Sequence, residues 1–363
     1  MINVFGSCVG QEELDEIKSS LDAQWLGMGK KVATLEQMLA DKLEVKEFTL
    51  IDNASNGLYM ALEILNLPKY SEVVIPAVTW ISCANAVLLA GYKPVFADVD
   101  YDTCNITTAT LNNVLTDRVK AVMIVHYAGM PAIIKTNLPI VSDAAHAVDS
   151  KYNDVPLSLL HTISVYSFDS MKNIACGELG GICSNNTRYQ SLTKKMRYCG
   201  ILKSGLNAST DKAKWWEYEI DEPFIKMLPD DIAASIGIAQ LKKLDILQAK
   251  RKAIWDKYND NFKDINWIAI PPEIPRGIKH SYFTYFIKVI NGKRNELARH
   301  LLNKGIYTTV RYEPLHLYKA YGSRQVLPIA EKLNEQLLNL PLHPNLTTSE
   351  VEYIIKTIKE LNW

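Results

Sequence analysis

Five short and almost continuously apolar segments constrain the fold of this chain more than any other feature. They span residues 72–78, 93–99, 120–127, 138–145 and 163–168. Parallel strands covered by helices have this appearance, because neither face of such a strand meets water. A helical pattern fills the first interval, residues 79–92, and Gly91 and Pro94 mark its end. The sequence therefore predicts an α/β fold with a mostly parallel central sheet flanked by helices.

The alternation of apolar strand segments and helices changes in the last third of the chain. Residues 230–262 form a long amphipathic stretch, which predicts one or two helices leading out of the sheet. Three prolines follow, and then a strand-like run at 281–290, a helix, a short strand and a terminal helix. With 363 residues the chain has room for two domains. We expect a large α/β domain over residues 1–250 and a smaller α+β domain over residues 251–363.

Composition excludes several classes of partner. The 40 basic and 40 acidic residues cancel, so no overall field draws the protein to nucleic acid or to a membrane surface. No apolar run approaches the ~20 residues that cross a bilayer, and the first residues do not resemble a secretory signal. The six cysteines contain no C-x-x-C pair, and the seven histidines show no metal-ligand spacing. We expect a cytoplasmic protein with reduced thiols and no metal site.

Two of the strand ends offer groups for a phosphate and for a flat ring, at the place where ligands bind in open α/β sheets. A short apolar segment, residues 48–51, runs into Asn53-Ala54-Ser55 at the start of a helix. Ser55 is a candidate N-cap, and the free amides of that first turn suit an anion; a plain capped helix is the alternative. Trp80 directly follows another strand, where it either stacks on a planar ligand or packs in the core.

A third strand end carries two titratable groups. Asp143 lies where the strand at 138–145 ends, and His146 follows three residues later. A carboxylate at such a place is costly unless it meets a cation or several donors, and a protonated heteroaromatic nitrogen is one such cation. The alternative interpretation is an aspartate that caps a helix, with a hydrogen-bonded histidine beside it.

The fourth strand end presents a single lysine. Lys172 lies in a polar turn that passes through Gly177, Gly180 and Gly181 before a second strand begins. Lysines in turns are usually solvated, but a partly desolvated lysine is a nucleophile and a base. A phosphate cradle, a ring stacker, a carboxylate for a ring nitrogen and an amine nucleophile together describe the binding site of one cofactor, pyridoxal 5'-phosphate (PLP).

The chain resembles the DegT/DnrJ/StrS family of PLP-dependent sugar aminotransferases, and the likeness runs nearly from end to end. Blocks such as "NASNGLYMAL", "SDAAHAV", "SFDSMKNIACGELGG" and "DIAASIGIAQLKKLD" fall in the family's order, and the block around Lys172 is the most specific. "VTWIS", "VHYAG" and "KNIACGE" most resemble the ArnB-like branch, which aminates 4-keto sugar nucleotides. The resemblance implies a fold-type I homodimer in which both subunits build each active site.

The resemblance also implies roles for the residues around the cofactor ring. Lys172 would form the Schiff base with the cofactor, and Asp143 would hold the pyridinium nitrogen. His146 would lie near the phenolic oxygen of the ring, and Trp80 would stack on its face.

Further roles concern the phosphate and the sugar. Ala54 and Ser55 would bind the phosphate through backbone amides and the Ser55 hydroxyl, with Ser167 as a further ligand. Lys226 occupies the place where the family offers an Asn or Lys from the partner subunit, and His316 matches the histidine that lines the sugar pocket.

Some positions depart from the family pattern. Ala54 stands where glycine is usual, Cys199 where histidine is frequent, and Leu228 where a polar residue is common. The stretch "GMPAIIKTNLPIVSD" (129–143) has little room for the helix that normally joins two strands there. Either one face of the sheet is locally exposed, or another element covers it.

The predicted function is transfer of an amino group from an amino acid to the keto carbon of a nucleotide-linked keto-deoxy sugar. Ping-pong chemistry through Lys172 follows from the cofactor, whereas glutamate as the donor and C4 as the acceptor carbon are implied by the resemblance. The alternatives are a 3-aminotransferase and a non-catalytic sugar-nucleotide-binding regulator of the same fold. The related dehydratases have histidine in place of the lysine, so Lys172 disfavours that chemistry. Family members of this kind supply amino sugars for surface polysaccharides and glycosylated small molecules.

Four basic residues are candidates for binding the diphosphate of a sugar nucleotide. Each is more often a solvated surface charge, so none is assigned as a ligand. The candidates are Arg197, Lys203, Arg311 and Arg324.

Overall fold

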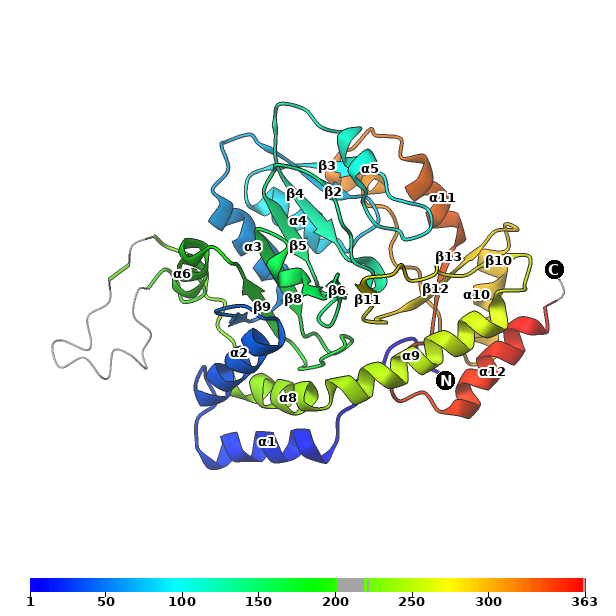
Figure 1. The fold of residues 1–363 in the computed structure, drawn as a ribbon, viewed down its shortest axis with the longest axis horizontal. Helices are drawn as coiled ribbons and strands as arrows, with labels where there is room; N and C mark the ends of the chain where they lie inside the picture. The colour runs from blue at the N-terminus through cyan, green and yellow to red at the C-terminus, as the bar shows by residue number, and fades with distance from the viewer. Residues whose placement is uncertain (202–218, 221, 362) are drawn as a thin grey trace.

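A seven-stranded sheet forms the centre of the molecule (Figure 1). The structure is a computed structural model that describes residues 1–201, 219, 220, 222–361 and 363. In spatial order the strands are β1 (Thr49–Ile51), β9 (Gly180–Cys183), β8 (Ile163–Ser167), β5 (Ile140–Asp143), β4 (Val119–Val125), β2 (Glu72–Pro76) and β3 (Lys93–Ala97). All neighbours are parallel except β9, which runs antiparallel to both β1 and β8. The five strands predicted from the apolar segments and the mostly parallel sheet are confirmed.

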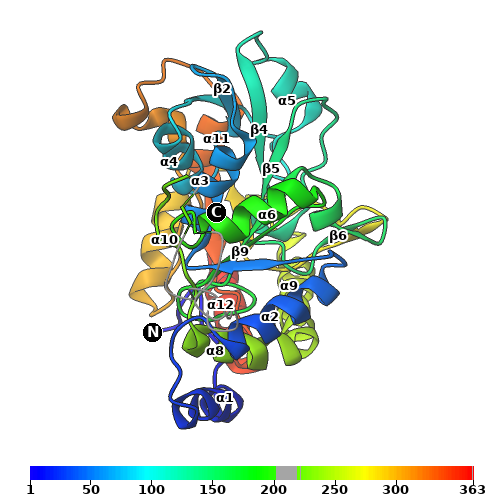
Figure 2. The same ribbon diagram turned by 90° about the vertical axis from the view of Figure 1, so that its left-hand side faces the viewer.

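Helices cover both faces of this sheet, as its buried strands require (Figure 2). One face packs against α3 (Ala54–Leu65), α4 (Ser82–Leu89) and α6 (Thr187–Met196). The other face packs against α2 (Lys30–Lys42) and α8 (Asp231–Lys242), and α1 (Gln11–Asp22) lies on the outer side of α8. Successive residues of β8 point to the two layers, with Val165 in the first core and Tyr166 in the second.

The short connection between β4 and β5 contains no α-helix. It runs through η1 (Tyr127–Gly129) and then irregularly to β5. The sheet face at this point, including Val122 and Ile124, is covered by Leu111 of the short helix α5 (Thr108–Asn112) and by Ala132 of the connection itself. Of the two expected outcomes, the structure shows the second, in which other elements cover the face.

The C-terminal part forms a smaller antiparallel sheet with its own core. Its strands, in order, are β10 (Ile268–Ala269), β12 (Tyr285–Val289) and β13 (Leu337–Leu340). The helices packed on it are α9 (Leu244–Phe262), α10 (Arg294–Asn303) and α12 (Thr348–Lys359), whereas α11 (Pro328–Gln336) contributes to the large core. The remaining short elements are β6 (Lys151–Tyr152), β7 (Val155–Pro156), β11 (Ile278–Lys279), η2 (Leu157–Leu159), η3 (Leu315–Leu317) and η4 (Lys319–Tyr321).

The long amphipathic stretch is two helices, α8 and α9, which meet at Lys243. Helix α9 places Leu244 in a core of the large sheet and Trp255, Tyr258 and Phe262 in the core of the small sheet. A boundary near residue 250 therefore falls inside one continuous helix, and the expected division of the chain there stays a prediction. Among the described residues, no helix has the length and apolar character needed to span a membrane.

Candidate active site

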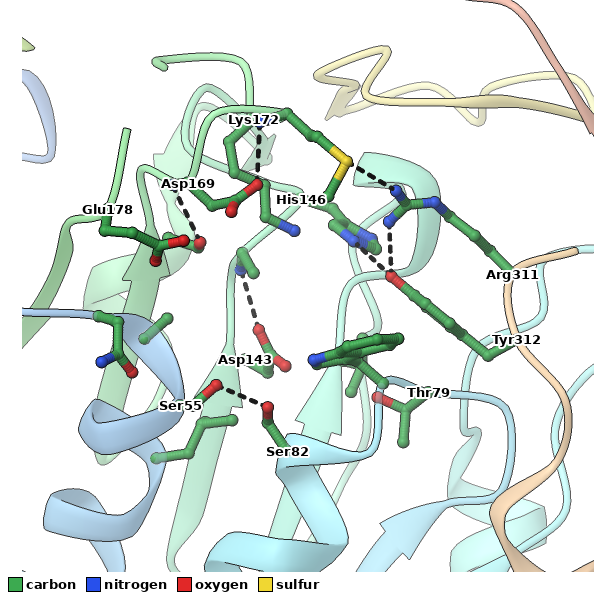
Figure 3. A pocket seen from close by; sticks show the side chains of 18 of the residues that line it. Ser55, Thr79, Ser82, Asp143, His146, Asp169, Lys172, Glu178, Arg311 and Tyr312 are labelled. Carbon is green, nitrogen blue, oxygen red and sulfur yellow. Dashed lines mark hydrogen bonds between the residues drawn. The ribbon is translucent and has the colours of Figure 1, made fainter. Parts of the chain in front are cut away.

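A cavity of about 340 Å³ opens beyond the carboxyl ends of the parallel strands (Figure 3). Its walls come from the start of α3, the segment after β2, the ends of β5 and β8, the loop after β8 and residues 309–312. Seven of the residues to which the resemblance gives a role line this one cavity. They are Ala54, Ser55, Trp80, Asp143, His146, Ser167 and Lys172.

The start of helix α3 forms one end of the cavity. Asn53 is the N-cap, and its side chain accepts a hydrogen bond from the Asn56 amide at 2.9 Å. The prediction that Ser55 caps the helix was wrong, because Ser55 already lies inside the first turn. The amides of Ala54 and Ser55 have no acceptor within the helix, as in any first turn. The Ser55 hydroxyl lies 2.6 Å from that of Ser82, so the site combines amides and hydroxyls suited to an anion.

Gly180 allows the start of β9 to lie directly against the start of α3. A Cβ atom on Gly180 would come within 2.5 Å of both the Ala54 nitrogen and the Asn53 carbonyl carbon. Real Cβ atoms do not approach backbone that closely, so a larger residue would displace the first turn of α3. The glycine therefore helps to fix the position of the first-turn amides of α3.

Lys172 lies in the loop that joins β8 to its antiparallel neighbour β9. Backbone hydrogen bonds close this loop, from Phe168 N to Leu179 O at 2.8 Å and from Ser170 N to Gly177 O at 2.9 Å. Gly177 has φ +91°, a conformation that favours glycine. Lys172 as a whole residue is half-buried, and its Nζ lies 4.8 Å from the centre of the Phe283 ring.

The surroundings of Lys172 favour its neutral form. Burial and the charge of the nearby Arg311 guanidinium lower the pKa of Lys172 to about 8, although Asp143 and Asp169 oppose the shift. A lysine with this pKa is a far better base and nucleophile near neutral pH than a solvated one.

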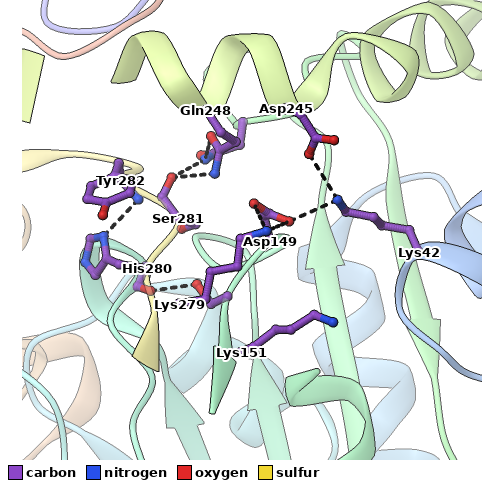
Figure 4. Close-up of polar contacts among 12 residues, drawn as sticks. Lys42, Asp149, Lys151, Asp245, Gln248, Lys279, His280, Ser281 and Tyr282 are labelled. Atoms are coloured by element: carbon purple, nitrogen blue, oxygen red, sulfur yellow. Dashed lines mark hydrogen bonds and ion pairs between the residues drawn. The ribbon is translucent and has the colours of Figure 1, made fainter. Parts of the chain in front are cut away.

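A polar network contacts the Lys172 loop, and Figure 4 shows the part of it around Gln248, Ser281 and Asp149. Asn173, next to Lys172, donates to Gln248 Oε1 at 2.7 Å and to the Ser281 carbonyl at 2.6 Å, and Gln248 donates to the same carbonyl at 2.8 Å. Nearby, buried Asp149 pairs with Lys42 at 3.1 Å and with Lys279 at 2.8 Å. The two Asn173 contacts join the loop to helix α9 and to the segment before β12.

Asp143 ends β5 with its carboxylate buried. Its oxygens accept hydrogen bonds from the Ala145 amide at 3.0 Å and from the Cys83 thiol at 3.3 Å. Burial raises the pKa of Asp143, and the charge of Lys172 acts against the increase. No helix begins at this turn, so the capping interpretation is excluded. A carboxylate with so few donors in a cavity suits a cationic partner such as a protonated ring nitrogen.

Aromatic side chains contribute to the wall of the cavity and to the layer behind it. His146 stacks on Phe283 with ring centres 4.0 Å apart, and its Nε2 lies 3.2 Å from the Tyr312 hydroxyl. Burial and the charges of Lys172 and Arg311 lower the pKa of His146 well below its usual value, so its imidazole is neutral. Trp80 is 53% exposed, which excludes the interpretation of a core tryptophan and leaves a ring face open to the cavity.

Two expected site residues lie apart from this cavity. Lys226 is exposed and makes an isolated β-bridge with Tyr198. His316 is buried and its Nε2 lies 3.2 Å from Glu331 Oε1. Within the described part of the chain, neither residue lines the cavity, and their expected roles stay predictions.

The four basic candidates have different environments. Arg311 lines the cavity and is 8% exposed, so the interpretation of a solvated surface charge was wrong for it. Arg197 is also buried, paired with Glu36 at 2.5 Å and bound to the Leu50 carbonyl at 2.9 Å, so it has a structural role. Arg324 is exposed, and Lys203 lies outside the described residues.

Sequence reasoning missed several residues of the cavity. Tyr312 and the buried position of Arg311 were not foreseen, because they come from the small-domain side of the chain, far from the strand ends in sequence. The run "TVRYEP" offers one signal, an arginine between Val310 and Tyr312 in a strand-like stretch. Asn53 could have been found from its own preference for N-cap positions.

Comparisons with known proteins agree with this geometry. The model of the DegT/DnrJ/EryC1/StrS aminotransferase family matches residues 7–359. The dTDP-4-dehydro-2,3,6-trideoxy-D-glucose 4-aminotransferase of Saccharopolyspora spinosa is 29% identical over 365 residues, which cover 98% of this chain and 95% of that protein. The crystal structure of the aminotransferase TlmJ from Streptoalloteichus hindustanus has a TM-score of 0.92 at 32% identity, covering 99% of this chain and 98% of that one. The PMP form of Spr1654 from Streptococcus pneumoniae has a TM-score of 0.92 at 26% identity, covering 99% and 98%.

Proposed function

The chain belongs to the DegT/DnrJ/EryC1/StrS aminotransferase family, and we propose that it is a PLP-dependent enzyme that transfers an amino group from L-glutamate to C4 of a nucleotide-linked keto-deoxy sugar. The observation that carries this proposal is the cavity in which Lys172, Asp143 and the first turn of α3 face one another. The family and its sugar-nucleotide relatives support the class of substrate.

The residues of the cavity fit PLP at each of its functional groups. The free amides of Ala54 and Ser55, with the hydroxyls of Ser55 and Ser167, suit the phosphate. Asp143 is a buried carboxylate that suits a protonated pyridine nitrogen, and the exposed face of Trp80 suits the ring. Bound PLP supplies a ring that accepts electrons from the carbon that loses its proton.

The chemistry assigned to the chain itself is proton transfer and charge placement. The Lys172 amine is partly neutral near pH 7 because its pKa is about 8, so it can take the α-proton of the donor amino acid and return a proton in the second half-reaction. Asp143 places a negative charge where a ring nitrogen must stay protonated. His146 is neutral and held by Phe283 and Tyr312, so it adds a hydrogen-bonding group without adding charge.

Amination at C4 is the finer part of the proposal. The 4-aminotransferase from Saccharopolyspora spinosa, alike over nearly the whole chain, and the blocks shared with the ArnB-like branch support it. Amination at C3 is the alternative, since the two outcomes differ only in how the sugar lies in its pocket. A purely binding role is disfavoured because Lys172 keeps a lowered pKa beside Asp143, which sugar-nucleotide binding alone does not need.

We also propose that the enzyme acts as a homodimer in which Lys226 reaches the partner's phosphate site. Its exposed position, away from the cavity of its own chain, is compatible with this role. His316 would line the sugar pocket, as its place in the family motif implies.

The visible spectrum of the purified protein with PLP tests the proposal. We expect a yellow lysine-linked band, which borohydride fixes on Lys172 and which Lys172→Ala abolishes. Glutamate should bleach the band of the wild-type protein, and a 4-keto sugar nucleotide should restore it. The position of the new amine in the product, determined by NMR, decides between C4 and C3. Absence of any Lys172-dependent band with PLP supplied would exclude the catalytic function.

A further inference from the structure

The cavity contains a buried positive charge to which the proposed mechanism assigns no ligand. Arg311 is 8% exposed and lines the same cavity as Lys172. Its Nη1 donates to the Tyr312 hydroxyl at 2.8 Å, its Nη2 meets only the Met171 sulfur at 3.9 Å, and its buried Nε has no partner among the described residues. A buried guanidinium normally pairs with an anion, because an unpaired buried charge is costly.

The protein holds this guanidinium firmly in place. Its Cζ lies 3.9 Å from the centre of the Phe5 ring and 5.3 Å from that of Phe283. The Arg311 amide donates to Asn339 Oδ1 at 2.9 Å, and the Tyr127 hydroxyl donates to the Arg311 carbonyl. Neither aromatic face nor these backbone contacts neutralise the charge. Arg311 is therefore a fixed cation whose N–H groups remain available for a ligand.

The position of Arg311 relative to Lys172 restricts what this ligand is. The Lys172 amine lies 4.8 Å from the centre of the Phe283 ring, and the Arg311 Cζ lies 5.3 Å from the same centre. Burial lowers the pKa of Lys172, and the charge of Arg311 adds to this effect. An anion bound by Arg311 would share this cavity with the Lys172 amine and with the carbon whose proton Lys172 is proposed to move. Figure 3 shows Arg311 and Tyr312 on the side of the cavity toward which Lys172 and His146 also point.

We infer that Arg311 binds the α-carboxylate of the amino-acid donor. This inference rests on the proposed function. An α-carboxylate is bonded directly to the reacting carbon, so it must lie beside the Lys172 amine. The diphosphate of a sugar nucleotide is attached at C1, across the ring from C4, so it lies farther from the reacting carbon. The planar fork of a guanidinium matches a carboxylate with two parallel hydrogen bonds.

The test separates donor binding from acceptor binding in the PLP-loaded enzyme. Arg311→Met should raise the glutamate concentration that half-saturates bleaching of the yellow band by about 10- to 100-fold, the range for losing a hydrogen bond to a charged group. The concentration of keto sugar nucleotide that half-saturates the return of the yellow band should stay unchanged. Arg276→Met is the matched control, because Arg276 is exposed and lies outside the cavity.

Two further ligands distinguish a carboxylate contact from a structural effect. 4-Aminobutyrate lacks an α-carboxylate, so Arg311→Met should not change its half-saturating concentration. 2-Methylglutamate lacks the α-proton, and calorimetry of its binding should show the same loss of affinity as glutamate without any turnover. Arg311→Lys keeps a cation but loses the fork, so it should show a smaller loss and serves if the methionine variant does not fold.

The outcomes separate this inference from the proposed function. If Arg311→Met weakens the binding of glutamate and of 4-aminobutyrate equally, Arg311 only supports the structure. If the substitution weakens the binding of the sugar nucleotide alone, Arg311 is a diphosphate ligand. Either result overturns the inference. If glutamate fails to bleach the wild-type band, the proposed function fails. The binding of 2-methylglutamate still tests the inference in that case. Weaker binding to Arg311→Met than to the wild-type protein supports the inference, and equal binding to both overturns it.

Discussion

Substitution of Gly180 by alanine tests whether the close contact between β9 and α3 holds the cofactor's phosphate site in place. The added Cβ would lie 2.5 Å from the Ala54 nitrogen and from the Asn53 carbonyl carbon. Both are backbone atoms, which cannot move aside as the end of a flexible side chain could. Overpacking of this kind costs about 1–3 kcal/mol. At ~2.1 cal/mol/K of unfolding entropy per residue, a chain of this length should lose roughly 1–4 °C in Tm.

The same change should also weaken PLP binding, because it displaces the amides of Ala54 and Ser55, which are the proposed phosphate ligands. A hydrogen bond to a charged group contributes ~1.5–3 kcal/mol, so the loss of one such contact should weaken affinity about tenfold or more. Titration of the apo protein with PLP, followed at the yellow band, measures this effect.

Gly181→Ala provides a matched control on the next residue. Its side chain points to the opposite face of β9, where the added methyl group would meet the buried Phe48 ring rather than the helix. We expect Gly181→Ala to lower Tm by a similar amount and to leave PLP affinity almost unchanged. If both variants bind PLP equally well, the backbone contact at Gly180 does not position the phosphate site and the reasoning is refuted.

Three further predictions concern the groups around Lys172. The rate at which PLP reacts with the apo protein should rise with pH around a midpoint of about 8, because only a neutral amine reacts and the pKa of Lys172 is lowered to about 8. A midpoint near 10.5 would contradict the effect of burial and of Arg311 on this pKa. Asp143→Asn should lower turnover by ~100-fold or more with unchanged circular dichroism, since an amide cannot hold a ring nitrogen protonated; turnover equal to wild type would exclude the assigned role. If Lys172→Ala and Lys226→Ala chains are mixed and pair at random, about half of the dimers are mixed, and one of the two sites in each mixed dimer has both lysines, so activity should return at about a quarter of all sites. If the mixture is no more active than the separate variants, the two subunits do not share a site.

The parts of the fold that were predictable leave a local record in the sequence. Most residues of strands β2, β3, β4, β5 and β8 are buried, so each strand lies in a largely apolar run. The residues that follow these strands could be placed at one edge of the sheet, because parallel strands end on the same side. Lys172, Asp143 and Trp80 were found in this way.

The rest of the site depends on contacts that no local pattern records. Arg311 and Tyr312 enter the cavity because the segment before α11 folds back over the large domain, and a single arginine in a strand-like run gives no sign of burial. The N-cap was misplaced because "DNASN" offers several capping residues in a row. Asn53 takes the position because its side chain reaches the Asn56 amide, while Asn56 is held by Asp52 at 2.7 Å.

The reversed direction of β9 has a consequence for how the protein reaches its native state. The pairing of Ser167 with Gly180 joins residues closer in the chain than any other pairing of the described seven-stranded sheet, since the parallel neighbours are connected by longer crossovers. The entropy lost on closing a loop grows with its length, so this hairpin has the smallest kinetic penalty in the sheet. We expect the loop that carries Lys172 to be formed early in folding, as a local unit on which the more distant strands and the Arg311 side of the cavity assemble later.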